Sequence, residues 1–107
     1  MKICFIDYTK FKYSFKDKEN PILRGAETTL INLSYHLSIL NNEVYIFNNC
    51  SEKIHFKNYY WNDIDQLNKS QMSFDVAIAN GDINLLNNIN AKKNLLSHIL
   101  YSPLKNL

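Results

Sequence analysis

The chain has 107 residues, the length of one domain that buries roughly two thirds of its unfolded surface, so we do not expect these residues by themselves to form a multi-domain enzyme. Hydrophobic residues make up 46% and charged residues 21%, which makes disordered, collagen-like and coiled-coil classes poor fits. The formal net charge of +2 is too small to indicate a nucleic-acid partner, so any anion site must be local. Two cysteines, Cys4 and Cys50, form no disulfide framework or metal knuckle, and we expect reduced thiols and a cytoplasmic location.

The first half of the chain predicts a strand, a loop, a helix and a strand. Residues 2–7 form a short apolar run that ends in Asp7, typical of a strand buried on both faces. Residues 8–24 are polar and irregular and predict a long loop. From Gly25 to about Asn41 the apolar spacing is that of a helix, and residues 44–47 predict a second buried strand. The apolar helix positions are Ala26, Leu30, Leu33, Leu37 and Leu40.

The second half of the chain carries weaker signals. Residues 74–79, followed by Asn-Gly-Asp, predict a third buried strand. The other expected elements are a short edge strand at 54–56, a poor helix at 62–72, a short helix at 83–89 and a strand at 95–101 that Pro103 ends.

A strand, helix and strand within fifty residues form a βαβ unit with parallel strands. We therefore expect an α/β fold, a three-layer Rossmann-like parallel sheet with strand order 3-2-1-4-5. No stretch approaches the ~18 apolar residues of a membrane span, and the N-terminus does not resemble a signal peptide.

The order of these elements resembles the N-terminal domain of GT-B glycosyltransferases, particularly the large retaining family 4. Members of that family begin with an apolar strand, a loop, Gly-Gly-Ala-Glu, a Leu-rich helix and Gly-His-Glu-Val before the next strand. The similarity covers most of residues 1–50 and continues more weakly through residues 74–79. The matching residues are the run Arg24, Gly25, Ala26, Glu27 and the run from Asn42 to Phe47.

The resemblance implies that residues 1–107 are an incomplete GT-B N-terminal, acceptor-side domain. Whole enzymes of that type transfer a sugar from a nucleotide-sugar donor to a saccharide or lipid-linked acceptor, with no metal or other cofactor. Their donor pocket lies in a second domain, before which this chain ends, so we expect the chain alone to be inactive. The alternative is a small non-catalytic Rossmann-like binding module, because fold does not imply function.

The start of the expected helix is the candidate ligand site. First-turn N–H groups lack helical partners and carry partial positive charge, so Arg24, Gly25, Ala26 and Glu27 are expected to bind a phosphate. Arg24 replaces the first glycine of the resembled pair and adds a cation that can meet phosphate. The other interpretation is that Gly25 is a turn residue, Arg24 a surface charge and Glu27 a carboxylate that favours the helix dipole.

Lysines alternate with aromatic residues between residues 10 and 16. Lys10, Lys12 and Lys16 are candidate contacts to an anionic acceptor, or to the inner face of a membrane that carries a lipid-linked acceptor. The other interpretation, which we favour from the sequence, is a loop whose aromatics pack on the domain while its lysines are solvated.

Three further expectations concern metals, carboxylates and assembly. The histidines are far apart in sequence, so we expect no metal site, and His98 does not match the family's catalytic position. Asp63 and Asp65 suit a helix start better than an acid/base pair. A strand at 95–101 with apolar residues on both faces would leave an open sheet edge, so we expect self-association through it.

Overall fold

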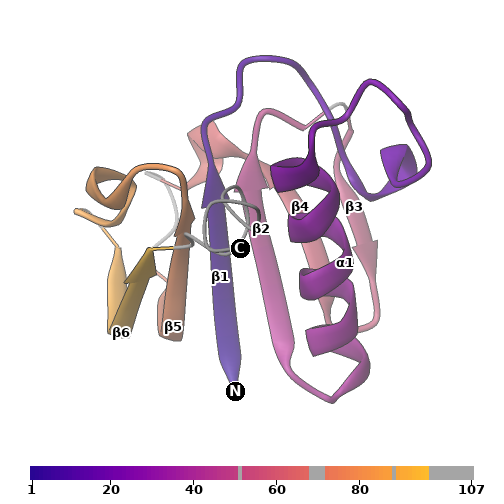
Figure 1. Cartoon of the computed structure of the whole chain (residues 1–107). Helices are drawn as coiled ribbons and strands as arrows, with labels where there is room; N and C mark the ends of the chain where they lie inside the picture. The colour runs from indigo at the N-terminus through magenta and orange to yellow at the C-terminus, as the bar shows by residue number, and fades with distance from the viewer. Residues whose placement is uncertain (51, 68–71, 88, 97–107) are drawn as a thin grey trace, which may run out of the picture.

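The computed structural model describes residues 1–50, 52–67, 72–87 and 89–96. They form an α/β fold in which a mixed, mostly parallel sheet of six strands is covered on one face by a single α-helix (Figure 1). The helix is α1, Gly25–Ile39. The strands are β1 (Lys2–Asp7), β2 (Glu43–Asn48), β3 (Ile54–Phe56), β4 (Tyr59–Asp63), β5 (Ser73–Asn80) and β6 (Asn90–Leu96).

The strand order is β3-β4-β2-β1-β5-β6, which differs from the predicted five-strand order. The difference lies at one edge, where β3 pairs antiparallel with β4 and all other neighbours are parallel. In the turn between these two strands Lys57 has a φ of 53°, which lets the chain reverse sharply. The short edge strand predicted at residues 54–56 is confirmed, and it joins β4 as a hairpin.

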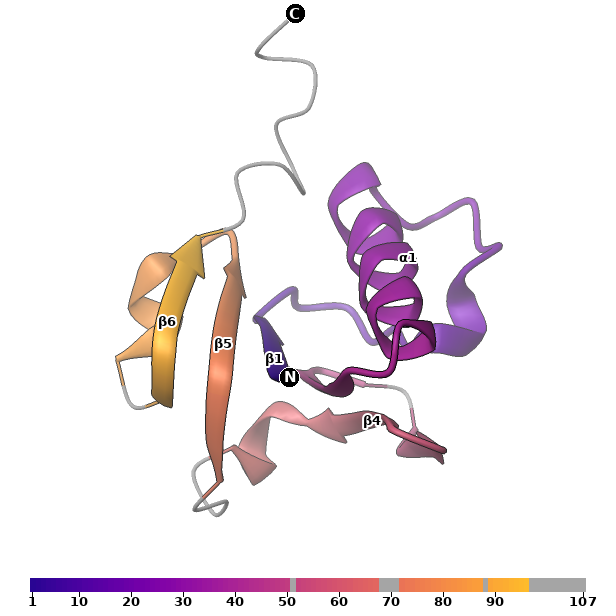
Figure 2. The same cartoon turned by 90° about the horizontal axis from the view of Figure 1, so that it is seen from below.

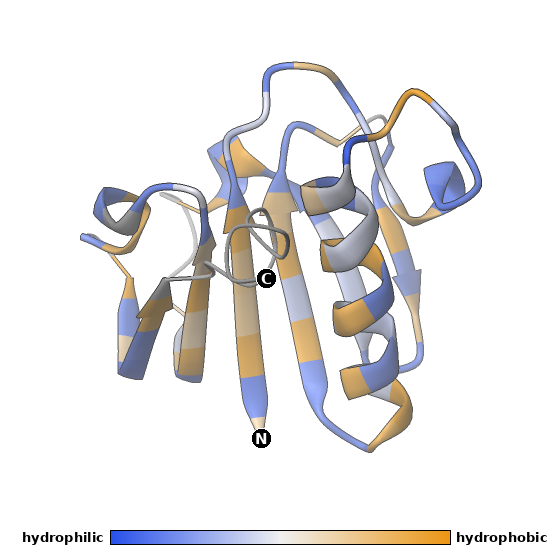
Figure 3. Ribbon diagram, in the orientation of Figure 1, coloured by the Kyte–Doolittle hydropathy of each residue, from blue (hydrophilic) through white to orange (hydrophobic). Residues whose placement is uncertain are grey.

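Helix α1 covers the face of the sheet on which Ile3 and Phe5 of β1 lie (Figure 2). Its predicted range is confirmed. Of the apolar positions that predicted it, Ala26 and Leu30 are buried, whereas Leu33 and Leu40 are exposed. Hydrophobic and hydrophilic residues alternate around the helix in Figure 3, and the apolar period alone does not fix which of them meet the sheet. The buried positions of α1 are Ala26, Glu27, Leu30, Ile31, Ser34 and Ser38.

The opposite face of the sheet carries a second apolar cluster that includes Cys4, Ile6 and Phe47. Two 3₁₀ turns pack there, η2 (Ile64–Gln66) and η3 (Ile83–Leu86), in place of α-helices. The expected three layers are therefore not found in the described residues, which place an α-helix on one face alone.

Two of the weaker predictions are wrong in type or position. Of the helix expected at 62–72, residues 62–66 are instead the end of β4 and turn η2, and residues 68–71 lie outside the described residues. The run before them forms a strand because its alternate side chains, Tyr59 and Trp61, are buried in the core. The strand expected at 95–101 begins earlier, at Asn90, and residues 97–101 lie outside the described residues. Apolar runs mark buried strands, whereas β6 is an edge strand whose lysines face solvent.

In the described part of the chain, no helix is long and apolar enough to cross a lipid bilayer.

Candidate functional site

Polar residues gather where the central strands end. Asp7, Asn48 and Asn80 are the last residues of β1, β2 and β5, and all three are buried. Strand β1 lies between β2 and β5, so the chain turns to opposite sides after its central strands. In open α/β sheets, ligands bind outside the carboxyl ends of the strands at such a point.

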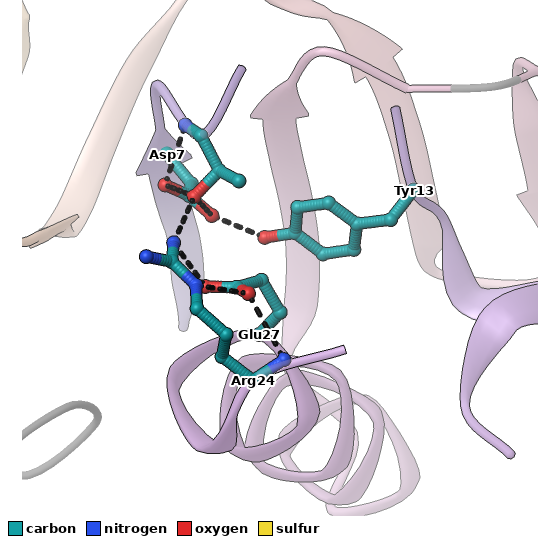
Figure 4. Close-up of polar contacts among 5 residues, drawn as sticks. Asp7, Tyr13, Arg24 and Glu27 are labelled. Carbon is teal, nitrogen blue, oxygen red and sulfur yellow. Dashed lines mark hydrogen bonds and ion pairs between the residues drawn. The ribbon is translucent and has the colours of Figure 1, made fainter. Parts of the chain in front are cut away.

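Asp7 accepts hydrogen bonds from two residues of the loop that follows β1. The Tyr13 hydroxyl donates to Asp7 Oδ2 (Figure 4). The backbone N–H and the hydroxyl of Thr9 donate to Asp7 Oδ1 at 3.0 and 2.9 Å. These bonds satisfy a carboxylate that is only 3% exposed, so Asp7 holds the loop after β1 against the sheet.

Arg24 and Glu27 form a forked ion pair at the start of α1. Arg24 Nε donates to Glu27 Oε1 at 2.9 Å, and Nη2 donates to Oε2 at 3.0 Å (Figure 4). The N–H of Arg24 also donates to Glu27 Oε1, at 3.2 Å. The Glu27 side chain is fully buried, whereas that of Arg24 is 66% exposed, so Arg24 forms a lid over the carboxylate.

A contact between Arg24 and Thr9 joins this ion pair to the Asp7 cluster, since Nη2 also donates to the Thr9 hydroxyl at 3.3 Å. Burial and the neighbouring carboxylates of Asp7 and Glu27 raise the pKa of the Tyr13 phenol far above its ordinary value. Hydrogen bonding to Glu27 raises the pKa of Arg24. Tyr13 therefore stays protonated, and acts here as a hydrogen-bond donor and not as a base.

The first residue of α1, Gly25, is exposed beside this cluster. A Cβ built on it would meet no atom within 4 Å. The amides of Gly25, Ala26 and Glu27 lack carbonyl partners within the helix. Packing does not require a glycine here, but a ligand that approaches these amides does benefit from its small size.

The four predicted residues lie together at this turn, but they do not all face a ligand. The side chains of Arg24 and Glu27 bind each other, and Ala26 is buried. Only the exposed backbone of Gly25, and the Arg24 Nη1 group that bonds to none of the described residues, remain for an anion.

Two asparagines are the part of this edge that the sequence did not indicate. Asn80 stands opposite Asp7 in the β1–β5 register and therefore shares its face of the sheet. The side-chain oxygens of Asn48 and Asn80 are buried and accept no hydrogen bond from the described residues. The chain has sixteen asparagines, so asparagine by itself does not mark a site in this sequence. The one signal for Asn48 and Asn80 is that each follows a predicted strand.

The three candidate lysines lie on the loop after β1. Lys16 pairs with Glu52 at 3.0 Å. The carbonyl of Lys10 accepts a bond from Asn49 Nδ2 at 2.6 Å, while Lys10 and Lys12 are both exposed. The predicted packing of the loop's aromatics is partly confirmed, since Tyr13 is buried and Phe11 is 37% exposed.

A hollow of about 350 Å³ opens between the ends of β1, β2 and β4. Its lining mixes one lysine with two carboxylates, so it favours no single charge of ligand. The lining residues are Tyr8, Thr9, Lys10, Asn49, Asp63, Ile64 and Asp65.

No group of three or more potential metal ligands occurs within the described residues. The Asp63 carboxylate accepts the N–H of Asp65 at 2.9 Å, the start of a helical turn that the sequence indicated, although the turn is 3₁₀. His98 lies outside the described residues.

Comparisons with known proteins returned no relative. No family model matches the chain. No curated protein and no solved structure matches it either.

Proposed function

We propose that residues 1–107 are the N-terminal, acceptor-side portion of a GT-B-like glycosyltransferase. The observation that carries the proposal is the exposed Gly25 at the start of α1, which the bond from Arg24 to Thr9 ties to the carboxyl end of the central strand β1. The resembled sequence elements lie on β1, α1, β2 and β5, which meet at this edge. In the proposed enzyme, the Gly25 turn faces the phosphates of a nucleotide-sugar donor bound mainly by another domain.

Charge sets the strength of that contact. Glu27 and Asp7 place two carboxylates behind the turn, and the Arg24 guanidinium lies in front of them. Both carboxylates are buried whereas the Arg24 side chain is exposed, so Arg24 is the charged side chain of this cluster that a phosphate from solvent can reach. We therefore expect weak binding, in which the amides of the turn and Arg24 act together.

Amide NMR during titration with a nucleotide diphosphate or a sugar phosphate tests the site. We expect the largest shifts at Gly25, Ala26 and Glu27. The variant Gly25→Ala keeps the fold, since its Cβ meets nothing within 4 Å, yet it reduces the shifts by blocking the approach. Shifts elsewhere, or none up to millimolar ligand, would rule out the anion site.

The catalytic part of the proposal predicts no sugar transfer by this chain alone. Transfer requires donor and acceptor to be held together, and half of a cleft loses most of that advantage. Incubation with common nucleotide sugars should give no product above background, and reproducible turnover would contradict the proposal.

The second candidate is a small non-catalytic binding module. One observation favours it: the polar side chains of Asp7, Tyr13, Arg24 and Glu27 bind one another, as in a structural network. A module binds its ligand fully without a second domain, so micromolar affinity of the 107-residue chain for a phosphate ligand would favour the module. Millimolar affinity favours the transferase portion.

A further inference from the structure

The loop between β1 and α1 is tied at Tyr13 to the end of β2. The N–H of Tyr13 donates to the Asn49 carbonyl at 3.1 Å. Asn48 Nδ2 donates to the Tyr13 carbonyl at 2.9 Å, and the Tyr13 side chain is fully buried. The loop rises beyond the carboxyl ends of the strands in Figure 1, so it is a fixed projection of the molecule.

Apolar side chains on this projection face solvent. Tyr8 is 62%, Phe11 37% and Ile22 77% exposed. Arg24 connects the two ends of the loop, since its guanidinium bonds to Thr9 and lies 6.0 Å from the centre of the Phe11 ring. Phe11 is therefore a neighbour of Arg24, and Arg24 comes two residues after Ile22.

The same loop carries the net positive charge of the chain. Residues 8–24 contain five lysine or arginine side chains and two carboxylates, whereas the rest of the chain has seven and eight. One of the two carboxylates, Asp17, accepts the N–H of Ser14 at 2.9 Å. Lys10 and Lys12 are exposed and make no ion pair within the described residues.

We propose that residues 8–24 dock on the surface of an anionic lipid bilayer. Lys10 and Lys12 bind the headgroups, while Phe11 and Ile22 enter the interface between headgroups and acyl chains. An exposed isoleucine distinguishes this surface from a nucleic-acid site, which uses cations and stacked rings. This inference does not depend on the glycosyltransferase proposal, because it uses none of the α1 amides.

Sedimentation with lipid vesicles tests the proposal on the whole chain. We expect binding to vesicles of phosphatidylcholine with one third phosphatidylglycerol, and none to pure phosphatidylcholine. Binding should weaken with added salt, because salt screens exposed charges. Absence of binding to the anionic vesicles at low salt would overturn the proposal.

Two pairs of substitutions locate the contact. Lys10→Gln with Lys12→Gln should weaken binding about 25-fold, since each lysine near an anionic surface contributes about fivefold. Phe11→Ser with Ile22→Ser should also weaken it. All four side chains are exposed, so the fold should persist, as circular dichroism can verify.

The matched control is Lys57→Gln with Lys93→Gln, which makes the same change in charge at exposed positions outside the loop. Equal losses for the control and the loop variant would show attraction by net charge alone and overturn the docking surface. A second result would favour nucleic acid and overturn the proposal. In it, a single-stranded oligonucleotide binds the chain but not the Lys10 and Lys12 variant, and the Phe11 and Ile22 substitutions leave vesicle binding unchanged.

Discussion

Glu27 is fully buried while its partner Arg24 is two-thirds exposed, so the two members of this ion pair contribute unequally to stability. The carboxylate has left water and depends on its donors, whereas the guanidinium keeps much of its hydration. Removing the exposed partner therefore costs more than its surface position suggests. Asp7 is in a similar position, because Tyr13 and Thr9 supply its donors.

We predict that Arg24→Ala lowers the free energy of unfolding by about 1–2 kcal/mol, below the range for fully buried pairs because water reaches one side of this one. Adding Glu27→Gln should recover part of the loss, since the uncompensated carboxylate is then gone. Urea denaturation of both single variants and the double variant measures the coupling. Lys53→Ala, at another exposed site, serves as the control, with a change within about 0.5 kcal/mol. If the free-energy changes of Arg24→Ala and Glu27→Gln simply added in the double variant, the ion pair between Arg24 and Glu27 would be contradicted.

Three tyrosines make stability sensitive to alkaline pH. Burial raises the pKa of Tyr45 and of Tyr59 to about 12 each, and raises that of Tyr13 further. An unfolded tyrosine titrates near pH 10, so this stabilisation is complete below about pH 10 and is lost as pH rises toward 12. The slope reaches about 1.4 kcal/mol per pH unit for each fully buried tyrosine.

Denaturation series between neutral pH and pH 12 should therefore show a steep fall above pH 10. Tyr59→Phe should start less stable, because it loses the 2.6 Å bond between the hydroxyls of Ser34 and Tyr59, but fall less steeply. Tyr8→Phe, at a residue 62% exposed, should keep the original slope. If Tyr59→Phe lost unfolding free energy with pH as steeply as the original chain, Tyr59 would not contribute to the pH dependence.

The sequence predicts the range of helix α1 but not which face of the helix packs on the sheet. Its buried stripe contains Glu27, Ser34 and Ser38 beside Leu30 and Ile31. Ser34 donates to the Ile31 carbonyl at 3.1 Å, and Ser38 to the Tyr35 carbonyl at 2.6 Å. Such local bonds let serine face a core at little cost, so an apolar count cannot locate this face.

Two successive apolar positions of the helix, Leu30 and Leu33, should contribute differently to stability. Leu30 is fully buried and Leu33 is 40% exposed. We predict that Leu30→Ala costs about 2–4 kcal/mol of unfolding free energy and Leu33→Ala less than about 1 kcal/mol. Thermal or urea unfolding compares the two variants directly. Similar losses of unfolding free energy would contradict the observed orientation of α1, in which Leu30 faces the sheet and Leu33 does not.

For the molecule as a whole, the exposed sheet edges bear on assembly. Strand β6 pairs with β5 and with no other strand among the described residues. Lys92 and Lys93 are exposed on it, and charges of this kind oppose edge pairing. Leu95, 40% exposed, is an apolar residue further along the same strand. The edge is thus less apolar than the sequence alone indicated.

Self-association through β6 stays a prediction. We expect the molecular mass in sedimentation to rise with concentration, and Leu95→Lys to reduce that rise by adding a third charge to the strand. Leu40→Lys makes the same substitution at the residue after α1, which is 70% exposed, and should not change association. A monomer at every concentration would show that the edge does not pair.

The sequence by itself determined strands β1, β2 and β5 and the range of α1. Buried parallel strands are short apolar runs, and an amphipathic helix repeats every 3.6 residues, so both signals are local. The four residues of the helix start were also recognisable, because Arg24, Gly25, Ala26 and Glu27 are consecutive and open a helix.

Only the tertiary structure decided which groups meet. Tyr13 reaches Asp7 across a loop, and Arg24 binds Thr9 fifteen residues away, contacts that depend on how the chain folds back over β1. The β3–β4 hairpin and the burial of Ser34 depend likewise on what packs against them. Register and packing are non-local, so the residue pattern of one segment does not contain them.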